Sequence, residues 1–262
     1  PRRYTPMSST ALRTLKRPVL AALCAVTALG LTACGPSGSG SGEAKKAEPF
    51  AGLSGSQIAN KAIKATKTAD SLTLDANLKT TEGPMKAFMA LDTKGQCAGT
   101  ITMGPTGTME VIKAGKEAYI RFDEAFLREQ NEGGSPEETE AALKMLKGRW
   151  LKTDANDPEA KEGLEMCDLG AMLGEFETGA GSAERGEETT VNGKKALTLT
   201  EKDGDTTYKI YVATEGEPYL LKIDQKGGED PGTLSFTDYN KPVPAKKPAA
   251  KDILDLDKLG AE

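Results

Sequence analysis

Residues 71–92, Ser-Leu-Thr-Leu-Asp-Ala-Asn-Leu-Lys-Thr-Thr-Glu-Gly-Pro-Met-Lys-Ala-Phe-Met-Ala-Leu-Asp, decide the fold class of this chain. Every second position is apolar before and after Gly83-Pro84, and a period of two is typical of strands with one buried face. Gly-Pro is a turn-forming pair. The stretch therefore predicts two antiparallel strands that share one apolar face.

The same alternation continues along the chain in two sets. Three more runs follow the first pair, at 97–103, 108–113 and 117–122, and the segments between them are short and rich in turn formers. A second set contains Asn192-Gly193, which is a strong hairpin signal. Its five runs cover 187–191, 195–200, 206–213, 218–223 and 233–239. Two successive antiparallel meanders of five strands are predicted.

Helical signals precede the first meander and separate it from the second. Ser54 and Gln57 form a capping box ahead of a helix expected at 55–69. Between the meanders, a second capping box begins at Ser135. The expected segments there are a short helix at 123–130, a helix from 136, a return to the sheet at 148–152 and a Gly-interrupted helix from 157.

These elements predict an α+β fold. The expected architecture is one large curved antiparallel sheet with the helices gathered on one face. A sheet this wide tends to curl. Curling around helices creates a space between the two layers, and such spaces are favoured sites for apolar ligands.

The start of the chain has the composition of a secretory signal peptide. Basic residues precede an apolar run at 19–31, which is shorter than the ~20 residues of a membrane-spanning helix. Leu31-Thr32-Ala33-Cys34 resembles the bacterial lipobox. That resemblance implies diacylglycerol on the Cys34 sulfur and acylation, for example by palmitate, of the new N-terminus. Ordinary signal cleavage with Cys34 as a spare thiol is the alternative, and Met7 is the expected start of the signal.

Composition then divides the chain into four parts. Residues 1–33 are the expected signal peptide, and 34–48 form a Gly-, Ser- and Lys-containing tether after the lipidated cysteine. Residues 49–243 form the domain. A tail rich in Pro and Lys covers 244–262, and its apolar residues from Ile253 onward are able to form one last docking turn or helix.

Charge and residue usage exclude several classes of function. The chain has 262 residues and no histidine, which is the commonest general base, so we expect no enzyme activity and no cofactor. Removing residues 1–33, which hold five basic residues and no acid, takes the net charge from -5 to -10. A nucleic-acid partner is therefore not expected. Asp252, Asp255 and Asp257 lack the Gly and Glu of a calcium loop, so no metal site is predicted.

Cys97 and Cys167 are the two cysteines of the predicted exported domain. Exported cysteines usually pair, so a disulfide is expected between them. Two buried free thiols are the alternative. The protein is expected to be a monomer that contacts the membrane through the covalent lipid on Cys34.

Four motifs in the last third of the chain carry a resemblance to a known family. They are Thr190–Lys194, Tyr211–Ala213, Glu217–Ile223 and Leu234–Val243. Together with Gly148-Arg149-Trp150 they resemble the LppX/LprG-type extracytoplasmic lipoproteins. The fold of that family is similar to the LolA carrier, so the resemblance implies a half-open β-barrel with the helices on its concave face. Over about residues 54–243 the resemblance implies a LolA-like domain on the outer face of the bacterial cell membrane, with an acylated lipid or glycolipid as ligand.

The candidate cavity residues are apolar positions expected to face the inside of the sheet. Several are methionines, whose flexible thioethers suit an adaptable acyl-chain pocket, although ordinary core filling explains them as well. The candidates are Met85, Met89, Met103, Met109, Leu197, Leu199, Tyr208, Ile210, Leu221, Ile223 and Phe236. The hypothesis is a lipoprotein that binds or carries an acylated lipid. The alternative is a non-catalytic structural, sensor or protein-interaction lipoprotein with a collapsed cavity.

The lipobox gives the first testable prediction. Cys34→Ser should abolish lipidation because the thiol that accepts diacylglycerol is lost, and residues 49–243 should remain folded. Incorporation of labelled palmitate and partition with membranes measure the effect. A variant that still incorporates palmitate would show that the lipobox interpretation is wrong.

Overall fold

The computed structural model describes residues 48–174 and 181–255, which belong to one compact unit, Ala47–Glu262. The predicted signal peptide and Cys34 lie outside the described residues.

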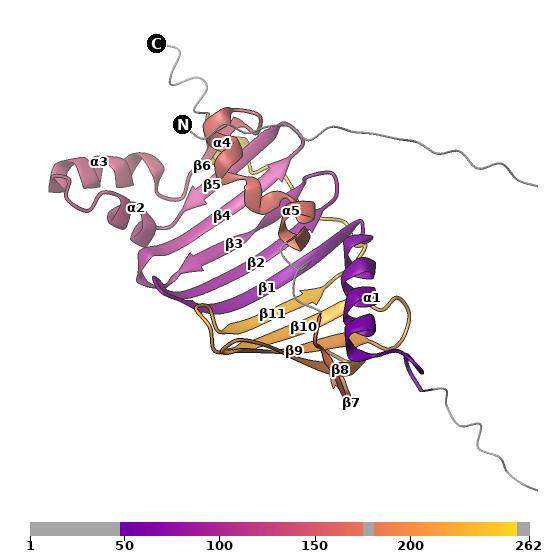
Figure 1. Ribbon diagram of the computed structural model, residues 1–262. Coiled ribbons are helices and arrows are strands. Elements are labelled where there is room, and N and C mark those ends of the chain that lie inside the picture. The colour runs from indigo at the N-terminus through magenta and orange to yellow at the C-terminus, as the bar shows by residue number, and fades with distance from the viewer. Residues whose placement is uncertain (1–47, 175–180, 256–262) are drawn as a thin grey trace, which may run out of the picture. The chain divides into compact units, whose positions relative to one another are not determined.

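One twelve-stranded sheet has the order β12-β6-β5-β4-β3-β2-β1-β11-β10-β9-β8-β7 (Figure 1). The strands are β1 (Ser71–Thr80), β2 (Gly83–Asp92), β3 (Cys97–Met103), β4 (Gly107–Ala114), β5 (Glu117–Phe122), β6 (Trp150–Asp154), β7 (Glu184–Val191), β8 (Lys194–Asp203), β9 (Thr206–Ala213), β10 (Leu220–Lys226), β11 (Gly232–Thr237) and β12 (Ile253–Asp255).

The two predicted meanders are confirmed as β1–β5 and β7–β11, and they merge into one sheet because β1 pairs with β11. All neighbouring strands are antiparallel except β12 and β6, which are parallel. The sheet curves around helices on one face, so the predicted α+β class is confirmed (Figure 1). We call the helix-bearing face the concave face and the other the convex face.

Helix α1 (Gly55–Lys67) lies on the concave face against β7–β10. The expected capping box is present, since Ser54 Oγ accepts from the Gln57 amide and Gln57 Oε1 accepts from the Ser54 amide. Gly55 packs so closely on the backbone of Ala183 that an added Cβ would clash with it. On the buried side of α1, Thr66 Oγ1 accepts a hydrogen bond from the Leu220 amide at 3.0 Å.

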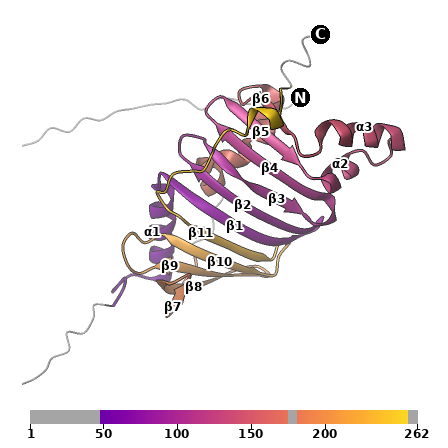
Figure 2. The same ribbon diagram turned by 180° about the vertical axis from the view of Figure 1, so that it is seen from behind.

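The middle helices divide into two groups. In the first, α4 (Pro158–Gly163), η2 (Glu165–Cys167) and α5 (Leu169–Gly174) form the predicted broken helix and lie over the concave face (Figure 1). In the second, α2 (Glu124–Gln130) follows β5 and contacts β4 near the 3-10 turn η1 (Gly104–Thr106). The capping-box helix α3 (Pro136–Leu146) contacts α2 and projects beyond the end of the strands (Figures 1 and 2). The expectation that the helices lie on the concave face is met by the first group and by α1.

Residues assigned to the tail by composition continue into the sheet. After β11, the chain crosses the convex face (Figure 2), where Lys247 Nζ lies 3.2 Å from Glu117 Oε2. The 3-10 turn η4 (Ala250–Asp252) then leads into β12, in which Ile253 is in register with Trp150 of β6. The expected docking turn or helix is therefore a turn followed by a short strand.

At the opposite edge of the sheet, β7 has a register shift between Arg185 and Glu188. Glu187 and Glu188 are exposed there. The Arg185 guanidinium donates to the carbonyl oxygens of Pro49 and Phe50, at 2.7 and 3.1 Å, and to Glu48 Oε1 at 2.8 Å. Arg185 therefore fixes the segment that leads into α1.

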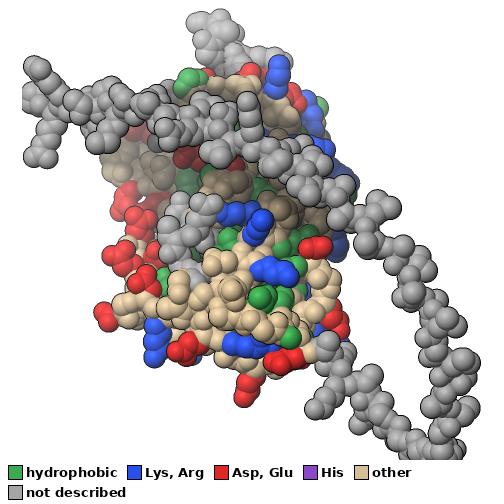
Figure 3. All heavy atoms as spheres, turned by 45° about the vertical axis from the view of Figure 1, so that its right-hand side comes forward, with side chains coloured by type: hydrophobic (Ala, Val, Ile, Leu, Met, Phe, Trp, Pro, Cys, Tyr) green, Lys and Arg blue, Asp and Glu red, His purple; other side chains and the backbone are tan. Residues whose placement is uncertain are grey.

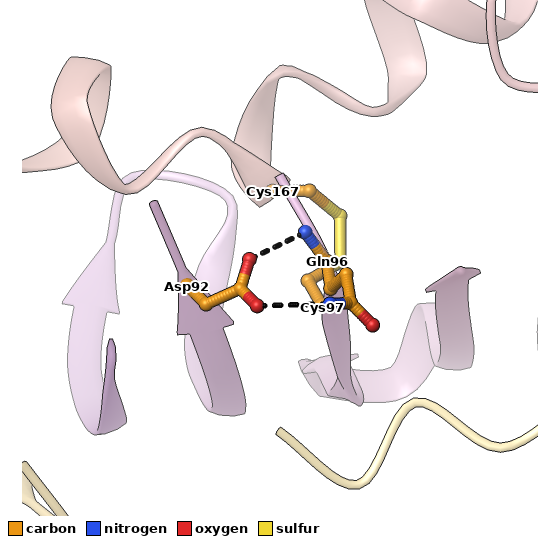
Figure 4. Close-up of a disulfide and its surroundings, with 4 residues drawn as sticks. All are labelled: Asp92, Gln96, Cys97 and Cys167. Atoms are coloured by element: carbon orange, nitrogen blue, oxygen red, sulfur yellow. Dashed lines mark hydrogen bonds between the residues drawn. A yellow bond between two sulfur atoms is a disulfide. The ribbon is translucent and has the colours of Figure 1, made fainter. Parts of the chain in front are cut away.

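The predicted disulfide is confirmed between Cys97 at the start of β3 and Cys167 in η2 (Figure 4). Both residues are fully buried, and their Cα atoms are 5.4 Å apart, within the usual range for a disulfide. The turn before Cys97 is held by Asp92, which accepts hydrogen bonds from the Gln96 backbone amide at 2.8 Å and from its side-chain amide at 3.1 Å. The bond therefore joins the broken helical cover to a well-ordered turn of the sheet.

The disulfide gives a prediction about stability. The double variant Cys97→Ala/Cys167→Ala should unfold at a lower urea concentration, because a cross-link over 70 residues limits the entropy of the unfolded chain. The expected loss is on the order of 4 kcal/mol in the chain-entropy model. Reduced wild-type protein should approach the double variant. Equal unfolding midpoints of the oxidised wild type and the double variant would contradict the prediction.

Candidate functional site

The concave face has a closed half and an open half. In the closed half, Leu72, Leu91 and Cys97 are at most 1% exposed and belong to one core cluster with Leu164 of the α4–η2 junction and Leu173 of α5. Here the helical cover meets the sheet directly. Side chains of the protein itself therefore fill this half.

Further along the same strands, the concave side chains are only half-buried. Register places Met85 opposite Met103, and it aligns Ala87, Ile101 and Met109 across three strands. We call the half-buried apolar set the open floor. It consists of Leu78, Met85, Ala87, Ile101, Met103, Met109, Phe122 and Leu234. None of its members carries a charge, so the open floor is an apolar surface.

Helix α2 borders the open floor at one end. The ring of Phe126 stacks on Phe122 with centroids 4.5 Å apart. The first turn of α2 is fixed by Asp123, whose Oδ1 accepts from the Phe126 amide at 2.8 Å. Gly107 allows this approach, since an added Cβ would meet the Phe126 amide nitrogen. Phe122 and Phe126 therefore form an aromatic border beside the methionines of the open floor.

The eleven candidate cavity residues fall into three groups. Six lie in the core cluster and are 8% exposed or less: Met89, Leu197, Leu199, Ile210, Ile223 and Phe236. Four are half-buried and share the concave face: Met85, Met103, Met109 and Tyr208. The remaining candidate is Leu221.

The inward placement of Leu221 is wrong. Leu221 packs with Ala196 and Ala213 in a separate small cluster, whereas Leu220 belongs to the main core. The physical reason is a register shift in β10 between Leu220 and Lys222, which breaks the alternation counted back from Ile223.

Sequence reasoning missed five of the eight residues of the open floor. Leu78, Ala87, Ile101, Phe122 and Leu234 belong to it and were not among the candidates. Ala87, Ile101 and Leu234 alternate in step with the candidates Met85, Met103 and Phe236, so extending the period of two would have found them. Leu78 and Phe122 join the floor through pairing with Met85 and Met109, which requires knowledge of the register.

A pocket of about 280 Å³ lies beside Leu221. It is lined by Val191, Asn192, Lys194, Leu221, Phe236, Thr237, Asp238, Tyr239 and Lys241. Two of the motifs that carry the family resemblance supply most of this lining. Lys241 Nζ forms an ion pair with Asp238 Oδ1 at 2.6 Å.

The same motif residues also form a structural corner after β11. Asp238 and Asn240 have positive φ angles of 49° and 59°. Tyr239 stacks on Tyr219 with ring centroids 4.1 Å apart, and its hydroxyl donates to the Leu220 carbonyl oxygen. Burial raises the pKa of the Tyr239 hydroxyl above its ordinary value. These contacts give the residues after β11 in the motif Leu234–Val243 a structural role, which is to form the turn of the chain.

Glu201 of β8 is a buried acid, 6% exposed, and it is in register with Tyr208. It accepts hydrogen bonds from the backbone amides of Ser182 and Gly181. Burial raises the pKa of the Glu201 carboxyl, and the negative charge of Asp203 acts in the same direction. The backbone amides oppose the shift without cancelling it.

Within residues 48–174 and 181–255, no group of three His, Cys, Asp or Glu side chains is arranged to hold a metal ion. In the same ranges, no helix has the length and apolar character that crossing a membrane requires.

Together, these elements define an α+β half-barrel, a curved sheet with helices and an apolar open floor on its concave face. No protein-family model matches the chain, and no curated protein sequence matches it. Solved structures do resemble it. LprF from Mycobacterium bovis has a TM-score of 0.49 and 14% identity, over 75% of this chain and 97% of LprF.

Two further solved structures have lower scores. The lipoprotein LppX from Mycobacterium tuberculosis has a TM-score of 0.46 and 11% identity, over 73% of this chain and 97% of LppX. A putative outer membrane lipoprotein-sorting protein domain from Vibrio parahaemolyticus has a TM-score of 0.25 and 11% identity, over 71% of this chain and 91% of that domain.

The raised pKa of Glu201 predicts how stability depends on pH. Between the ordinary glutamate pKa and the raised value, the folded state binds more protons than the unfolded state, so the free energy of unfolding falls as pH rises. Glu201→Gln keeps an oxygen for the two amides and removes the charge. The variant should therefore be more stable than wild type at neutral pH, and the difference should shrink on acidification.

Urea unfolding at a series of pH values below neutrality measures this difference. Glu188→Gln is the matched control, since Glu188 is an exposed acid on the neighbouring strand. A Glu201→Gln variant that is less stable than wild type at neutral pH would contradict the prediction.

Proposed function

We propose that this protein is a non-enzymatic lipoprotein that holds the acyl chain of an amphiphilic lipid on the open floor, outside the cell. The observation that carries the proposal is the apolar floor itself. Its half-buried side chains come from five neighbouring strands, β11 and β1–β4, with Phe122 of β5 at its border. A contiguous apolar surface that its own protein leaves partly uncovered marks a binding site more often than it marks ordinary protein surface.

Energetics favour an acyl chain as the occupant. Each methylene that leaves water for apolar surroundings contributes ~0.8 kcal/mol. Met85 and Met103 face one another across two strands, and their flexible side chains adapt to chains of different shape. The floor has no charged member and the chain has no histidine, so the site is suited to holding a lipid without reacting with it.

We also propose that the protein is anchored to the outer face of the cell membrane through lipid on Cys34. The lipobox supports this part of the proposal. A single short acyl chain holds a protein at a membrane only marginally, whereas two or three chains hold it durably.

A protein-interaction or sensor lipoprotein is the second candidate. It is favoured by the closed half of the concave face, where Met89 and Leu91 are 3% and 0% exposed and pack into the core cluster. The two candidates differ in whether the open floor takes up lipid.

Replacing two floor methionines tests the proposal. Met85→Gln/Met103→Gln keeps side-chain size and introduces polar groups, so the affinity for a fluorescent fatty acid or diacyl lipid should fall roughly tenfold, equivalent to about 1.4 kcal/mol. Fluorescence titration of the delipidated protein measures the affinity. The double variant should keep the circular dichroism and the unfolding midpoint of wild type to within a small change, because neither methionine belongs to the core cluster.

Met145→Gln is the matched control. Met145 is 55% exposed on α3, away from the open floor, so this variant should bind the probe as wild type does. If wild-type protein binds no acyl probe and carries no lipid when purified, the carrier proposal fails and the interaction module takes its place.

A further inference from the structure

The solvent side of α1 is basic. Its lysines are Lys61, Lys64 and Lys67, and the helix contains no acidic residue. A spacing of three residues keeps neighbouring side chains close on a helix surface. Lys61 and Lys64 are exposed, and neither forms an ion pair with another described residue. The opposite side of α1, with Ile58 and Ala62, is buried in the core.

This basic surface is unusual for so acidic a chain. The formal net charge is -5, and it falls to -10 when residues 1–33 are removed. Apolar groups accompany the lysines, since Lys61 Nζ lies 6.0 Å from the ring centroid of the half-buried Phe50 and Ile63 is half-buried between the two exposed lysines. Figure 3 shows lysine or arginine side chains interspersed with hydrophobic ones on the α1 side of the molecule.

In sequence, the N-terminal residues that precede the described part of the chain are followed by this same helix. Residues 34–47 separate Cys34 from Glu48, and Arg185 holds Glu48, Pro49 and Phe50 at the start of α1. That length of chain spans at most about 50 Å when fully extended. A lipid on Cys34 therefore keeps α1 near the membrane surface, at a distance set by the tether.

We propose that the exposed side of α1, with Lys61 and Lys64, contacts the membrane together with the adjoining half-buried Phe50 ring, and that the two lysines bind the anionic headgroups of its lipids. Lysine stems lie along apolar surface while their ammonium groups reach phosphate. Attraction between basic segments and anionic membranes acts within a Debye length of the surface, about 8 Å at physiological ionic strength. The tether brings α1 within reach, and the charge of α1 then sets the orientation.

The orientation has a consequence for the site. Helix α1 lies on the concave face, the face that also carries the open floor. Contact through α1 therefore turns the open floor toward the bilayer, from which an acyl chain would come. This inference rests on the proposed function for the anchor and for the ligand, but its principal test needs neither.

Lysine footprinting provides that test. The full chain is mixed with vesicles of phosphatidylcholine alone or of phosphatidylcholine with phosphatidylglycerol, labelled with a water-soluble amine-acylating reagent and analysed by mass spectrometry. Acylation of Lys61 and Lys64 should slow about fivefold on the anionic vesicles and recover at high salt. Lys79 and Lys86 are internal controls, because they are exposed on the convex face.

Each outcome decides between the proposals. Equal labelling of Lys61 and Lys64 on the two kinds of vesicle would overturn the membrane contact of α1. Slowing at all four lysines would show nonspecific adsorption and would also overturn it. Absence of lipid on Cys34, read from the mass of the chain, would refute the anchor proposal, and added vesicles would still test α1.

Paired variants test the link to lipid uptake. Lys61→Gln/Lys64→Gln should slow transfer of a fluorescent diacyl lipid from anionic vesicles several-fold and leave the affinity for the same probe in detergent-free solution unchanged. Lys79→Gln/Lys86→Gln removes the same charge from the convex face and should change neither. A loss of affinity in solution would assign the lysines to the ligand site and contradict membrane contact.

Discussion

The pairing of β1 with β11 is the interaction on which the concave face depends. It runs from Thr73 opposite Thr237 to Leu78 opposite Gly232 and joins two meanders that are otherwise separate sheets. Gly232 is required at its end, because an added Cβ would meet the Asn77 carbonyl oxygen. Without this pairing, α1 and the open floor would lie on different sheets. One continuous face therefore exists because two distant segments close against each other.

Local features of the fold could be predicted from the sequence, and nonlocal features could not. The capping boxes at Ser54 and Ser135 and the alternation in β1 and β2 act within a few residues, so their sequence signals are complete. No turn-forming residue marks the register shift between Leu220 and Lys222 in the sequence. Simple alternation therefore predicts the wrong face for Leu221. The strand β12 pairs with a strand about a hundred positions earlier, and composition alone describes only its proline-rich approach.

Prediction of the candidate site had the same limit. The methionines at 85, 103 and 109 were found because they alternate, but alternation cannot say which half of a face its own helices will cover. The bond between Cys97 and Cys167 and the packing of Leu164 and Leu173 hold a glycine-interrupted helical segment over one half only. Isolated helices as short as α4 and α5 are unstable in water, so their position depends on this cross-link and on packing. The disulfide therefore helps to set the boundary between the filled core and the open floor.

The two edges of the sheet have a further consequence if the proposed lipid anchor confines the protein to a membrane surface. Confinement to two dimensions raises the local concentration of copies, and an open strand edge offers unpaired amide and carbonyl groups to any neighbour. At one edge, β7 is distorted by a register shift and exposes Glu187 and Glu188, which repel a like strand. At the other edge, the three residues of β12 cover most of β6 with the chain's own end. Both edges therefore oppose the sheet-to-sheet aggregation that crowding would promote.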